Sequence, residues 1–272
     1  MRSVNGTPVL EVDHIGMTYR SRGGETVDAI GDIDFRVDAR ELLCIVGPSG
    51  CGKTSLLKVL SGLMRPTEGT ARFAGEPIVG PPDGLALVFQ EYSRSLLPWM
   101  SVVRNVALPL RAGGVGRNER RAAAEAALDA VDLAGFGDRY PWELSGGMQQ
   151  RVAIARAVAC RPRLLLMDEP FASVDAQTRA DLEDLVLRVH AELEVPTVFV
   201  THDIDEAVYL ADRVLVLSRR PSVTRTTVPI NLDRPRDQVE TRHDPEFVEA
   251  RTAIVQMIRA EQGSRARGIA KD

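Results

Sequence analysis

Two short stretches of the chain combine residue types that suit the binding of phosphate. Residues 47–55 read GPSGCGKTS, and residues 144–151 read LSGGMQQR. In both stretches glycines stand where a helix is expected to begin. Backbone N–H groups at a helix start, with no Cβ in the way, form a ready site for an anion. The sequence therefore raises the question of why one chain carries two such stretches.

The stretch at 47–55 matches the phosphate-loop pattern G-x-x-x-x-G-K-[ST]. Gly47, Gly50 and Gly52 would let successive N–H groups turn onto a nucleotide. Lys53 would reach the β and γ phosphates, and the hydroxyl of Thr54 would bind Mg²⁺. The alternative is a glycine-rich turn with an exposed lysine. The flanking apolar run ELLCIVG and the expected helix KTSLLKVLSGL favour the phosphate loop.

A second chemical feature is the pair of carboxylates that ends the stretch LLLMDE at 164–169. Four apolar residues predict a buried strand, and ligands bind at the carboxyl ends of the strands in open α/β sheets. Asp168 would hold Mg²⁺, directly or through water, and Glu169 would act as general base on the attacking water. An acidic pair after a strand is also found as a simple helix cap. Together with the phosphate loop, the catalytic interpretation is favoured.

The composition limits the classes of protein that fit. The chain has 272 residues, 44% hydrophobic and 26% charged, which suits one large domain or a domain with a lobe. A net charge of −4 argues against a nucleic-acid protein held by a basic surface. Three scattered cysteines suggest no disulfide framework and favour a reducing cytosol. We expect no signal peptide and no membrane span, so any membrane role would come through a partner.

The elements that must position these residues follow an α/β pattern. The opening third predicts strands in VLEVDHIGMTY and IGDIDFRV, and later strands are expected in RLLLMDEP, PTVFVTHD and RVLVLSRR. Helices are expected in RNERRAAAEAALDAVDL and AQTRADLEDLVLRVHAEL. Residues from about 91 to 160 look like a helical lobe inserted in the sheet domain. The tail predicts an amphipathic helix whose apolar face carries Phe247, Ala250, Ile254, Val255 and Ile258.

The phosphate loop, LSGGMQQR, LLLMDEP and VFVTHD occur in the order of an ATP-binding cassette, and the chain resembles the nucleotide-binding subunit of an ABC transporter over residues 9–220. The resemblance implies a P-loop NTPase fold with a mainly parallel sheet core, an N-terminal antiparallel β subdomain and an inserted helical subdomain at about 91–160. It implies an ATPase domain at 1–220 and leaves 221–272 as a C-terminal extension with one helix. ATP and Mg²⁺ are the implied cofactors.

The resemblance also implies roles for single residues. Tyr19 would stack on adenine, and Gln90 in LVFQE would contact Mg²⁺ and the attacking water. His202 in THD would contact the γ-phosphate. Taken alone, Tyr19 could be a strand-edge aromatic and His202 a core histidine. Met148 and Val174 depart from the commoner glutamine and leucine, and neither change removes a phosphate ligand. The remaining implied ATP contacts are the loop residues Gly47, Pro48, Ser49, Gly50, Cys51, Gly52, Lys53, Thr54 and Ser55, and the contacts across a dimer are Ser145, Gly146, Gly147, Gln149 and Asp175.

The family resemblance answers the question of the two anion sites. In such cassettes two copies pack head to tail, and the signature LSGG of one subunit caps the γ-phosphate held by the loop of the other. One ATP cannot fill both sites of one chain, whereas a two-fold dimer satisfies both at once. The expected partners are therefore a second copy of the chain and a transmembrane permease subunit, with a solute-binding protein as an indirect partner and no nucleic acid.

The segment LLPWM at 96–100, DEPFASVDAQTR and the tail RPRDQVETRHDPEF resemble the branch that imports nitrate, sulfonates and taurine. The expected location is the cytoplasmic face of the membrane. Trp99 and its neighbours could form the core of the lobe or a docking groove for the membrane subunit, and both interpretations stay open. A non-transport ABC ATPase working as a soluble clamp is the alternative function. The chain lacks the long coiled coil of chromosome ATPases, a second cassette, and the NKxD of GTPases.

Cys51 stands inside the phosphate loop, close to a helix start and to Lys53. Both neighbours favour a thiolate. The sequence therefore predicts that a maleimide inactivates the enzyme through Cys51 and that MgATP protects it. A small residue that only fills space is the alternative.

Overall fold

The structure is a computed structural model that describes residues 8–20, 23–90 and 95–268, with side chains given up to Glu261. The described chain divides into two compact units. The first contains the residues up to Asp83 together with those from Pro196 onward, and the second is Gly84–Val195. The boundaries predicted for the ATPase domain and its helical subdomain begin at residues 1 and 91, which lie outside the described residues. Those boundaries stay a prediction.

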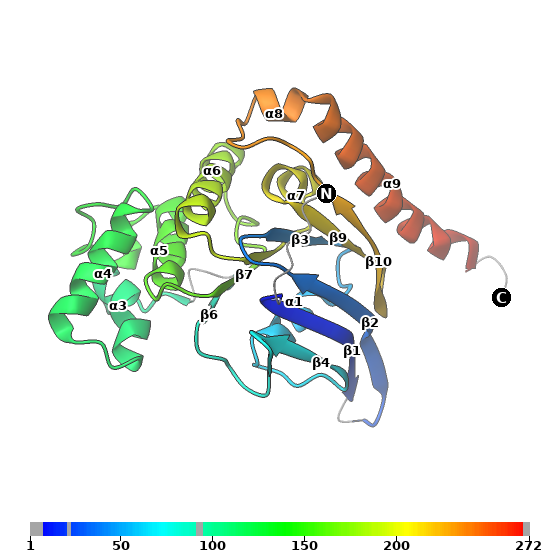
Figure 1. Cartoon of the computed structure of the whole chain (residues 1–272), viewed down its shortest axis with the longest axis horizontal. Coiled ribbons are helices and arrows are strands. Elements are labelled where there is room, and N and C mark those ends of the chain that lie inside the picture. The colour runs from blue at the N-terminus through cyan, green and yellow to red at the C-terminus, as the bar shows by residue number, and fades with distance from the viewer. Residues whose placement is uncertain (1–7, 21–22, 91–94, 269–272) are drawn as a thin grey trace. The chain divides into compact units, whose positions relative to one another are not determined.

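The first unit is a mixed sheet with helices beside it (Figure 1). Its strands follow one another in the order β5-β4-β1-β2-β10-β9-β3-β8. Their bounds are β1 Leu10–Arg20, β2 Thr26–Val37, β3 Leu42–Val46, β4 Glu68–Phe73, β5 Glu76–Pro77, β8 Thr197–Val200, β9 Arg213–Leu217 and β10 Ser222–Pro229. The helices are α1 Lys53–Leu60, α7 Ile204–Leu210, α8 Glu240–His243 and α9 Pro245–Gly268.

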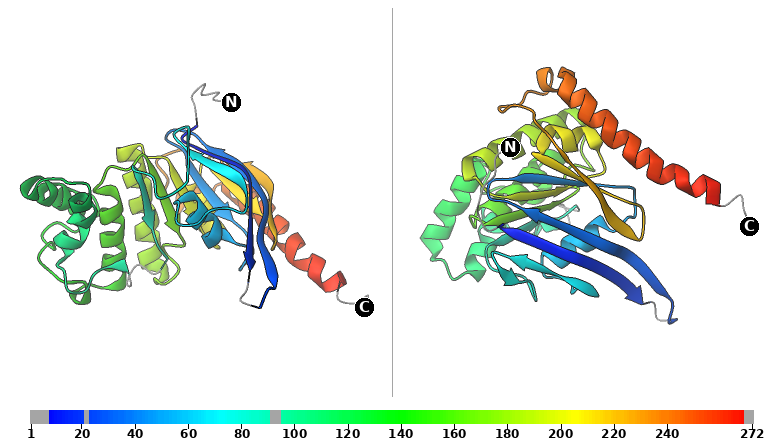
Figure 2. Two further views of the ribbon diagram at one scale, coloured as in Figure 1. Left: turned by 90° about the horizontal axis from the view of Figure 1, so that it is seen from below. Right: turned by 45° about the vertical axis from the view of Figure 1, so that its right-hand side comes forward.

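The antiparallel part of this sheet comes from the start of the chain. β1 pairs antiparallel with β2 and with β4, and Figure 2 shows these strands as one curved layer. Period-2 alternation places Leu10, Val12 and Ile33 on a buried face, as expected of a half-buried strand pair. The prediction of an N-terminal antiparallel β subdomain is confirmed.

The parallel part positions the phosphate loop. β3 pairs parallel with both β8 and β9, and every residue from Leu42 to Val46 is buried. A strand buried on both faces reads as a continuous apolar run, as LLCIV does. The carboxyl end of β3 then opens into the loop at 47–52, and α1 begins at Lys53.

The second unit contains the helices of the lobe and a parallel strand pair. Its elements are β6 Leu85–Val88, α3 Val102–Ala112, α4 Arg117–Asp129, a 3₁₀ turn at Pro141–Glu143, α5 Gly146–Val158, β7 Leu164–Asp168 and α6 Ala176–Leu193. β6 pairs parallel with β7. Figure 1 shows α3, α4 and α5 together as a helical group, and α5 also packs against β6 and α6. No helix in the described part of the chain is long and apolar enough to cross a membrane.

The expected C-terminal extension begins at 221, and the structure shows what that stretch contains. Residues 222–229 form β10, which pairs antiparallel with β9 and parallel with β2. The predicted tail helix is α9, with Phe247 and Ile254 buried on its inner face and Ala250, Val255 and Ile258 half-buried. This burial pattern fits an amphipathic helix, and the assignment of 221–272 as an extension with one such helix stays a prediction.

Candidate functional site

The phosphate loop has the backbone that its glycines predict. Gly50 has a φ of +73° and Gly52 a φ of +104°, a region that side chains with a Cβ rarely adopt. A Cβ built on Gly52 would lie 3.0 Å from the carbonyl oxygen of Ala29. Gly52 is also the N-cap of α1, where no side chain caps the helix, and the first turn contains no acidic residue. The positive end of this helix therefore suits an anionic group of ATP.

Lys53 lies along the inside of the loop. Its side chain is only 5% exposed, and Nζ donates hydrogen bonds to the carbonyl oxygens of Gly47, at 3.1 Å, and Pro48, at 3.4 Å. The adjacent Thr54 is exposed and Ser55 is half-buried. An ammonium held over the loop in this way suits phosphate oxygens, and the neighbouring hydroxyl suits a hard cation.

Tyr19 lies beside the phosphate-loop helix. Its hydroxyl is 2.9 Å from Oγ of Ser55 and also donates a longer contact, at 3.7 Å, to Sδ of Met64. The ring is half-buried at the end of β1. The structure thus brings Tyr19 to the loop, and its stacking on adenine stays a prediction.

His202 lies in the same unit as the loop, between β8 and α7, and is exposed. The next residue, Asp203, is the N-cap of α7. Its Oδ1 accepts hydrogen bonds from the backbone N–H groups of Asp205, at 2.9 Å, and Glu206, at 3.2 Å. The backbone position of His202 is therefore set by the start of α7.

The two predicted carboxylates follow each other at the end of β7 in the second unit. Asp168 is the last residue of the strand and is buried, whereas Glu169 is half-buried. Glu169 has a φ of +41°, which is strained for a residue with a side chain. Backbone strain of this kind is concentrated at functional sites, where the surrounding structure imposes it. This geometry fits a residue whose side chain must point in a fixed direction.

The signature stretch begins α5. Ser145 is the N-cap, and its Oγ accepts a hydrogen bond from the N–H of Met148 at 3.3 Å. Ser145 and Gly146 are exposed. Gln149 turns its amide back onto the chain and donates to the carbonyl oxygens of Pro141, at 3.0 Å, and Leu144, at 3.2 Å. The exposed start of this helix is a second position suited to an anion.

Asp175 bonds to Thr178, and Thr178 lies beside Gly147 of the signature stretch. Asp175 is the N-cap of α6 and accepts hydrogen bonds from the N–H of Thr178, at 3.0 Å, and its Oγ1, at 2.7 Å. These bonds stabilise the carboxylate and lower the pKa of Asp175. A Cβ on Gly147 would meet Cγ2 of Thr178 at 2.5 Å. The residues predicted to reach across a dimer are thus gathered on one part of the second unit.

Gln90 is exposed and follows β6 by two residues. Its amide oxygen, the Thr54 hydroxyl and the Asp168 carboxylate are hard oxygen donors of the kind that Mg²⁺ prefers. The described residues contain no group of three or more His, Cys, Asp or Glu that could hold a metal alone. That is compatible with Mg²⁺, which is usually held by one or two protein carboxylates and the phosphates of its nucleotide. Each of the three groups is of a chemical type that suits this cation, and their joint role in holding it stays a prediction.

Cys51 is not the accessible thiol that the sequence predicts. Its side chain is 1% exposed, and Cys44 is also buried, whereas Cys160 is exposed. A Cβ on Gly47 would lie only 3.0 Å from Sγ of Cys51, so the sulfur fills the base of the loop. The interpretation of Cys51 as a small filling residue fits this position better than a reactive thiolate.

We therefore expect a maleimide to modify Cys160 before Cys51 in the native protein. Neighbouring atoms desolvate the sulfur and raise the pKa of the Cys160 thiol, so its labelling should accelerate as the pH rises above neutral. Peptide mass mapping after short labelling at two pH values checks this order. Labelling of Cys51 first, with protection by MgATP, would restore the original interpretation.

Three features of the second unit were not found from the sequence. Asn105, fully buried in α3, accepts a hydrogen bond from the N–H of Leu97 and donates to the carbonyl oxygens of Leu97, Met100 and Ser101 at 3.1–3.2 Å. Arg156 of α5 donates to the carbonyl oxygen and Oγ of Ser95 at 2.6 and 2.8 Å. Within the described residues, the fully buried amide of Gln150 has no hydrogen-bond partner. A polar residue in an apolar helical stretch is the signal that could have indicated all three.

Comparison with known proteins gives consistent results. The family described as "ABC transporter" matches residues 30–172. The chain is 44% identical over 252 residues to an uncharacterised ABC transporter ATP-binding protein of Methanocaldococcus jannaschii, covering 93% of this chain and 92% of that protein. It is 38% identical to the nitrate import ATP-binding protein NrtD of Synechocystis, covering 96% and 99% of the two chains. It is 42% identical to the taurine import ATP-binding protein TauB of Chromobacterium violaceum, covering 94% and 98%.

A solved structure is similar in fold as well. The dimeric ATP-binding cassette MJ0796, in a post-hydrolysis state bound to ADP and Pi, superposes with a TM-score of 0.72 at 30% identity. The match covers 82% of this chain and all of that one. The predicted fold class is thereby confirmed.

Proposed function

The chain belongs to the ABC transporter family of ATPases, and from this premise we propose that it is the ATP-hydrolysing subunit of an importer for a small anion. Nitrate, a sulfonate or taurine is the substrate class that the relatives' names favour. The observation that carries the proposal is the phosphate loop between β3 and α1, with left-handed glycines at 50 and 52. The solute itself would pass through a separate permease subunit.

In this proposal the first unit holds the nucleotide. The loop at 47–52 and the start of α1 surround the phosphates, Lys53 neutralises their charge, and Tyr19 contacts the adenine. His202 contacts the γ-phosphate from the start of α7. Glu169 accepts a proton from the attacking water as its oxygen approaches phosphorus. When bound, MgATP supplies the phosphoryl group whose transfer to water releases free energy for transport.

Thr54, Asp168 and Gln90 are the residues that would hold Mg²⁺. Each presents an oxygen at the end of a strand or the start of a helix, and each belongs to a type that suits this cation. The cation would offset the negative charge of the phosphates.

We further propose that two copies work as a head-to-tail dimer. The signature residues Ser145 and Gly147 and the cap residue Asp175 share one part of the second unit, as a surface that meets a partner's nucleotide requires. The similar cassette MJ0796 is dimeric, which supports this arrangement. A dimer of this kind at the cytoplasmic face of the membrane would transmit hydrolysis to the permease.

The segment that would dock on the permease is 96–100, in which Pro98 and Trp99 are exposed while Leu96 is buried. Trp99 is 69% exposed, so its side chain is not part of the core of the second unit. Asn105 holds the backbone on either side of Trp99 through its hydrogen bonds to Leu97 and Met100, and Arg156 holds Ser95. A large aromatic side chain held outward on a fixed loop is typical of an interface anchor.

We expect Trp99→Ala to weaken assembly with the permease by about 30- to 1,000-fold, because truncating an aromatic anchor costs about 2–4 kcal/mol of binding free energy. The melting temperature of the isolated subunit should stay nearly unchanged, since an exposed side chain contributes little to the core. Co-purification with the permease, beside thermal melting, measures both quantities. Identifying the ligand of the associated solute-binding protein would then define the substrate.

Trp142 is a matched control for this experiment. It is the other tryptophan of the chain, it is 64% exposed in the same unit, and it stacks on Tyr140 with ring centroids 4.6 Å apart. Trp142→Ala should leave assembly intact. A large drop in melting temperature for Trp99→Ala, or equal loss of assembly in both variants, would refute docking at Trp99. Failure of the wild-type chain to co-purify with any permease would favour a soluble ATP-driven clamp instead.

A further inference from the structure

The helix that follows His202 depends on a distant part of the chain. α7 has seven residues, and a helix this short is not stable by itself in water. The last carbonyl groups of any helix also need partners from outside it. In α7 these partners come from the segment at 232–254, which the proposed ATP chemistry does not use.

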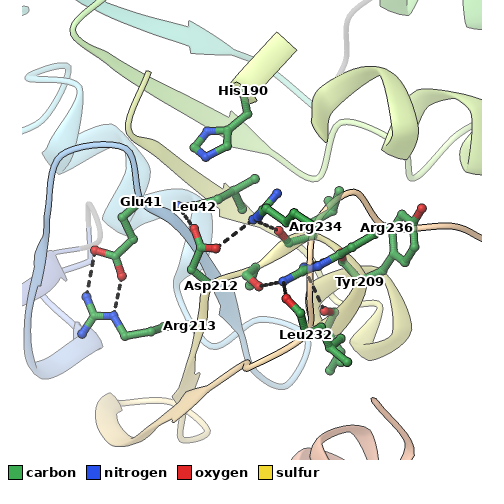
Figure 3. Close-up of polar contacts among 12 residues, drawn as sticks. Glu41, Leu42, His190, Tyr209, Asp212, Arg213, Leu232, Arg234 and Arg236 are labelled. Atoms are coloured by element: carbon green, nitrogen blue, oxygen red, sulfur yellow. Dashed lines mark hydrogen bonds and ion pairs between the residues drawn. The ribbon is translucent and has the colours of Figure 1, made fainter. Parts of the chain in front are cut away.

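Two arginines of this segment cover the carboxyl end of α7 (Figure 3). Arg236 donates hydrogen bonds to the carbonyl oxygens of Tyr209, at 2.6 Å, and Ala211, at 2.9 Å, with a longer contact to Val208 at 3.5 Å. Arg234 donates to the carbonyl oxygen of Leu210 at 3.1 Å. Positive charge at the carboxyl end of a helix also offsets the negative end of its dipole.

The rest of the segment packs along α7. Arg242 lies over the ring of Tyr209 with its guanidinium carbon 4.9 Å from the ring centroid, a cation–π contact. Phe247 and Ile254 of α9 are buried, and α9 packs against α7. At the amino end of α7, Nε of Arg251 is 2.5 Å from Oδ1 of Asp205. The segment therefore holds α7 at both ends and along one face.

The same segment is joined to the strand that leads to the phosphate loop. Asp212 accepts a hydrogen bond from Arg234 on Oδ1 at 2.9 Å and from the N–H of Leu42 on Oδ2 at 2.8 Å (Figure 3). Leu42 is the first residue of β3, whose last residue precedes the loop. α7 and β3 are thus fixed relative to each other through one carboxylate within the first unit.

From these contacts we propose that the segment at 232–254 positions His202 relative to the phosphate loop, with Arg236 and Arg251 as positioning residues. The proposal rests on the role assigned to His202 in hydrolysis. His202 immediately precedes the N-cap of α7, so a shift of α7 moves the imidazole directly. Through His202 the segment acts on the catalytic step.

The test compares Arg236→Gln and Arg251→Gln with Arg225→Gln. Arg225 of β10 pairs with Glu261 of α9 at 2.9 Å. The control variant therefore also removes an arginine contact of α9, but this contact involves neither α7 nor the segment at 232–254. Arg251 lies on the surface, and its substitution should leave folding intact even if Arg236→Gln destabilises the protein. Melting temperature, ATP affinity, KM and kcat are measured for each variant.

We expect Arg236→Gln to lower kcat by about tenfold. A misplacement of roughly 1 Å can cost a reaction about a hundredfold in rate, and we expect His202 to move by less than that. Arg251→Gln should lower kcat by a smaller factor, and Arg225→Gln should not change it. KM and ATP affinity should stay at wild-type values in all three. The imidazole signals of His202, assigned by their loss in His202→Ala, should shift in the two positioning variants in NMR spectra of the full chain.

A double-substitution experiment separates positioning from general weakening of the fold. In the His202→Ala background, adding Arg251→Gln should lower kcat no further, because the positioned group is already gone. A further loss of the same size, or unchanged His202 signals in both positioning variants, would overturn the proposal. Wild-type kcat in His202→Ala would instead overturn the role of His202, while its NMR signals would still report whether the segment positions it.

Discussion

Glu169→Gln is expected to lower the rate of ATP turnover by about 100- to 10,000-fold, the usual contribution of a general base. Glutamine keeps the length and shape of the side chain but cannot accept the proton of the attacking water. Lys53, Thr54 and Asp168 remain, so MgATP should bind with unchanged affinity. In the proposed head-to-tail dimer, bound ATP holds the two copies together until it is hydrolysed, so the variant should elute as a dimer in the presence of MgATP. Steady-state phosphate release and size-exclusion chromatography measure the two effects.

The chain provides a matched control for this substitution. Glu194 also has a left-handed backbone, with a φ of +50°, and it is exposed at the end of α6 in the same unit. Glu194→Gln tests the effect of the same chemical change at a similarly strained position away from the carboxylate pair, and its turnover should be that of the wild type. Turnover at the wild-type rate in Glu169→Gln would show that another group acts as the base.

A mixed dimer of Lys53→Ala and Ser145→Arg chains should hydrolyse ATP, although each variant alone should be almost inactive. In the head-to-tail arrangement, one of its two sites combines the intact loop of the Ser145→Arg chain with the intact signature of the Lys53→Ala chain. The other site carries both defects. With two independent sites, the mixed dimer should reach about half of the wild-type activity. Co-expression with two affinity tags isolates this species for assay.

The structure provides a check that the two variants stay folded. Nζ of Lys53 donates hydrogen bonds to carbonyl oxygens of its own loop, so Lys53→Ala removes no contact to a distant element through these bonds. Ser145 is exposed, and the expected cost of losing its N-cap is about 1 kcal/mol. Melting temperatures close to that of the wild type would confirm folding. If each chain's own signature served its own loop, the purified mixed dimer would be as inactive as the two homodimers.

The sequence predicts the phosphate loop well because its determinants are local. Left-handed backbone at 50 and 52 requires glycine, and a buried strand such as LLCIV needs a continuous apolar run. The strand that ends at Asp168 is predicted for the same reason, because LLLM is a continuous apolar run and all five residues of β7 are buried. The roles assigned to the site residues through the family resemblance stay predictions, and the substitutions above test them.

Features that depend on distant contacts could not be predicted. α7 has only seven residues, and its carboxyl end is covered by arginines that follow more than twenty positions later. β10 reads SVTRTTVP, a threonine-rich stretch that gains its strand character by pairing with β9 and β2. The burial of Cys51 and the exposure of Trp99 depend on how a loop turns, and residue type alone does not determine that. In each of these examples, contacts between residues distant in the sequence determine the local structure or the burial.

The fixed loop around Trp99 also has a mechanical consequence. Ser145 is the N-cap of α5. Arg156, which holds Ser95, lies eleven positions later in the last turn of the same helix. At about 1.5 Å per residue, this separation is about 16 Å of continuous helix. In the proposed assembly, a displacement of the loop would therefore be transmitted along α5 to Ser145 with little loss through bending of the helix.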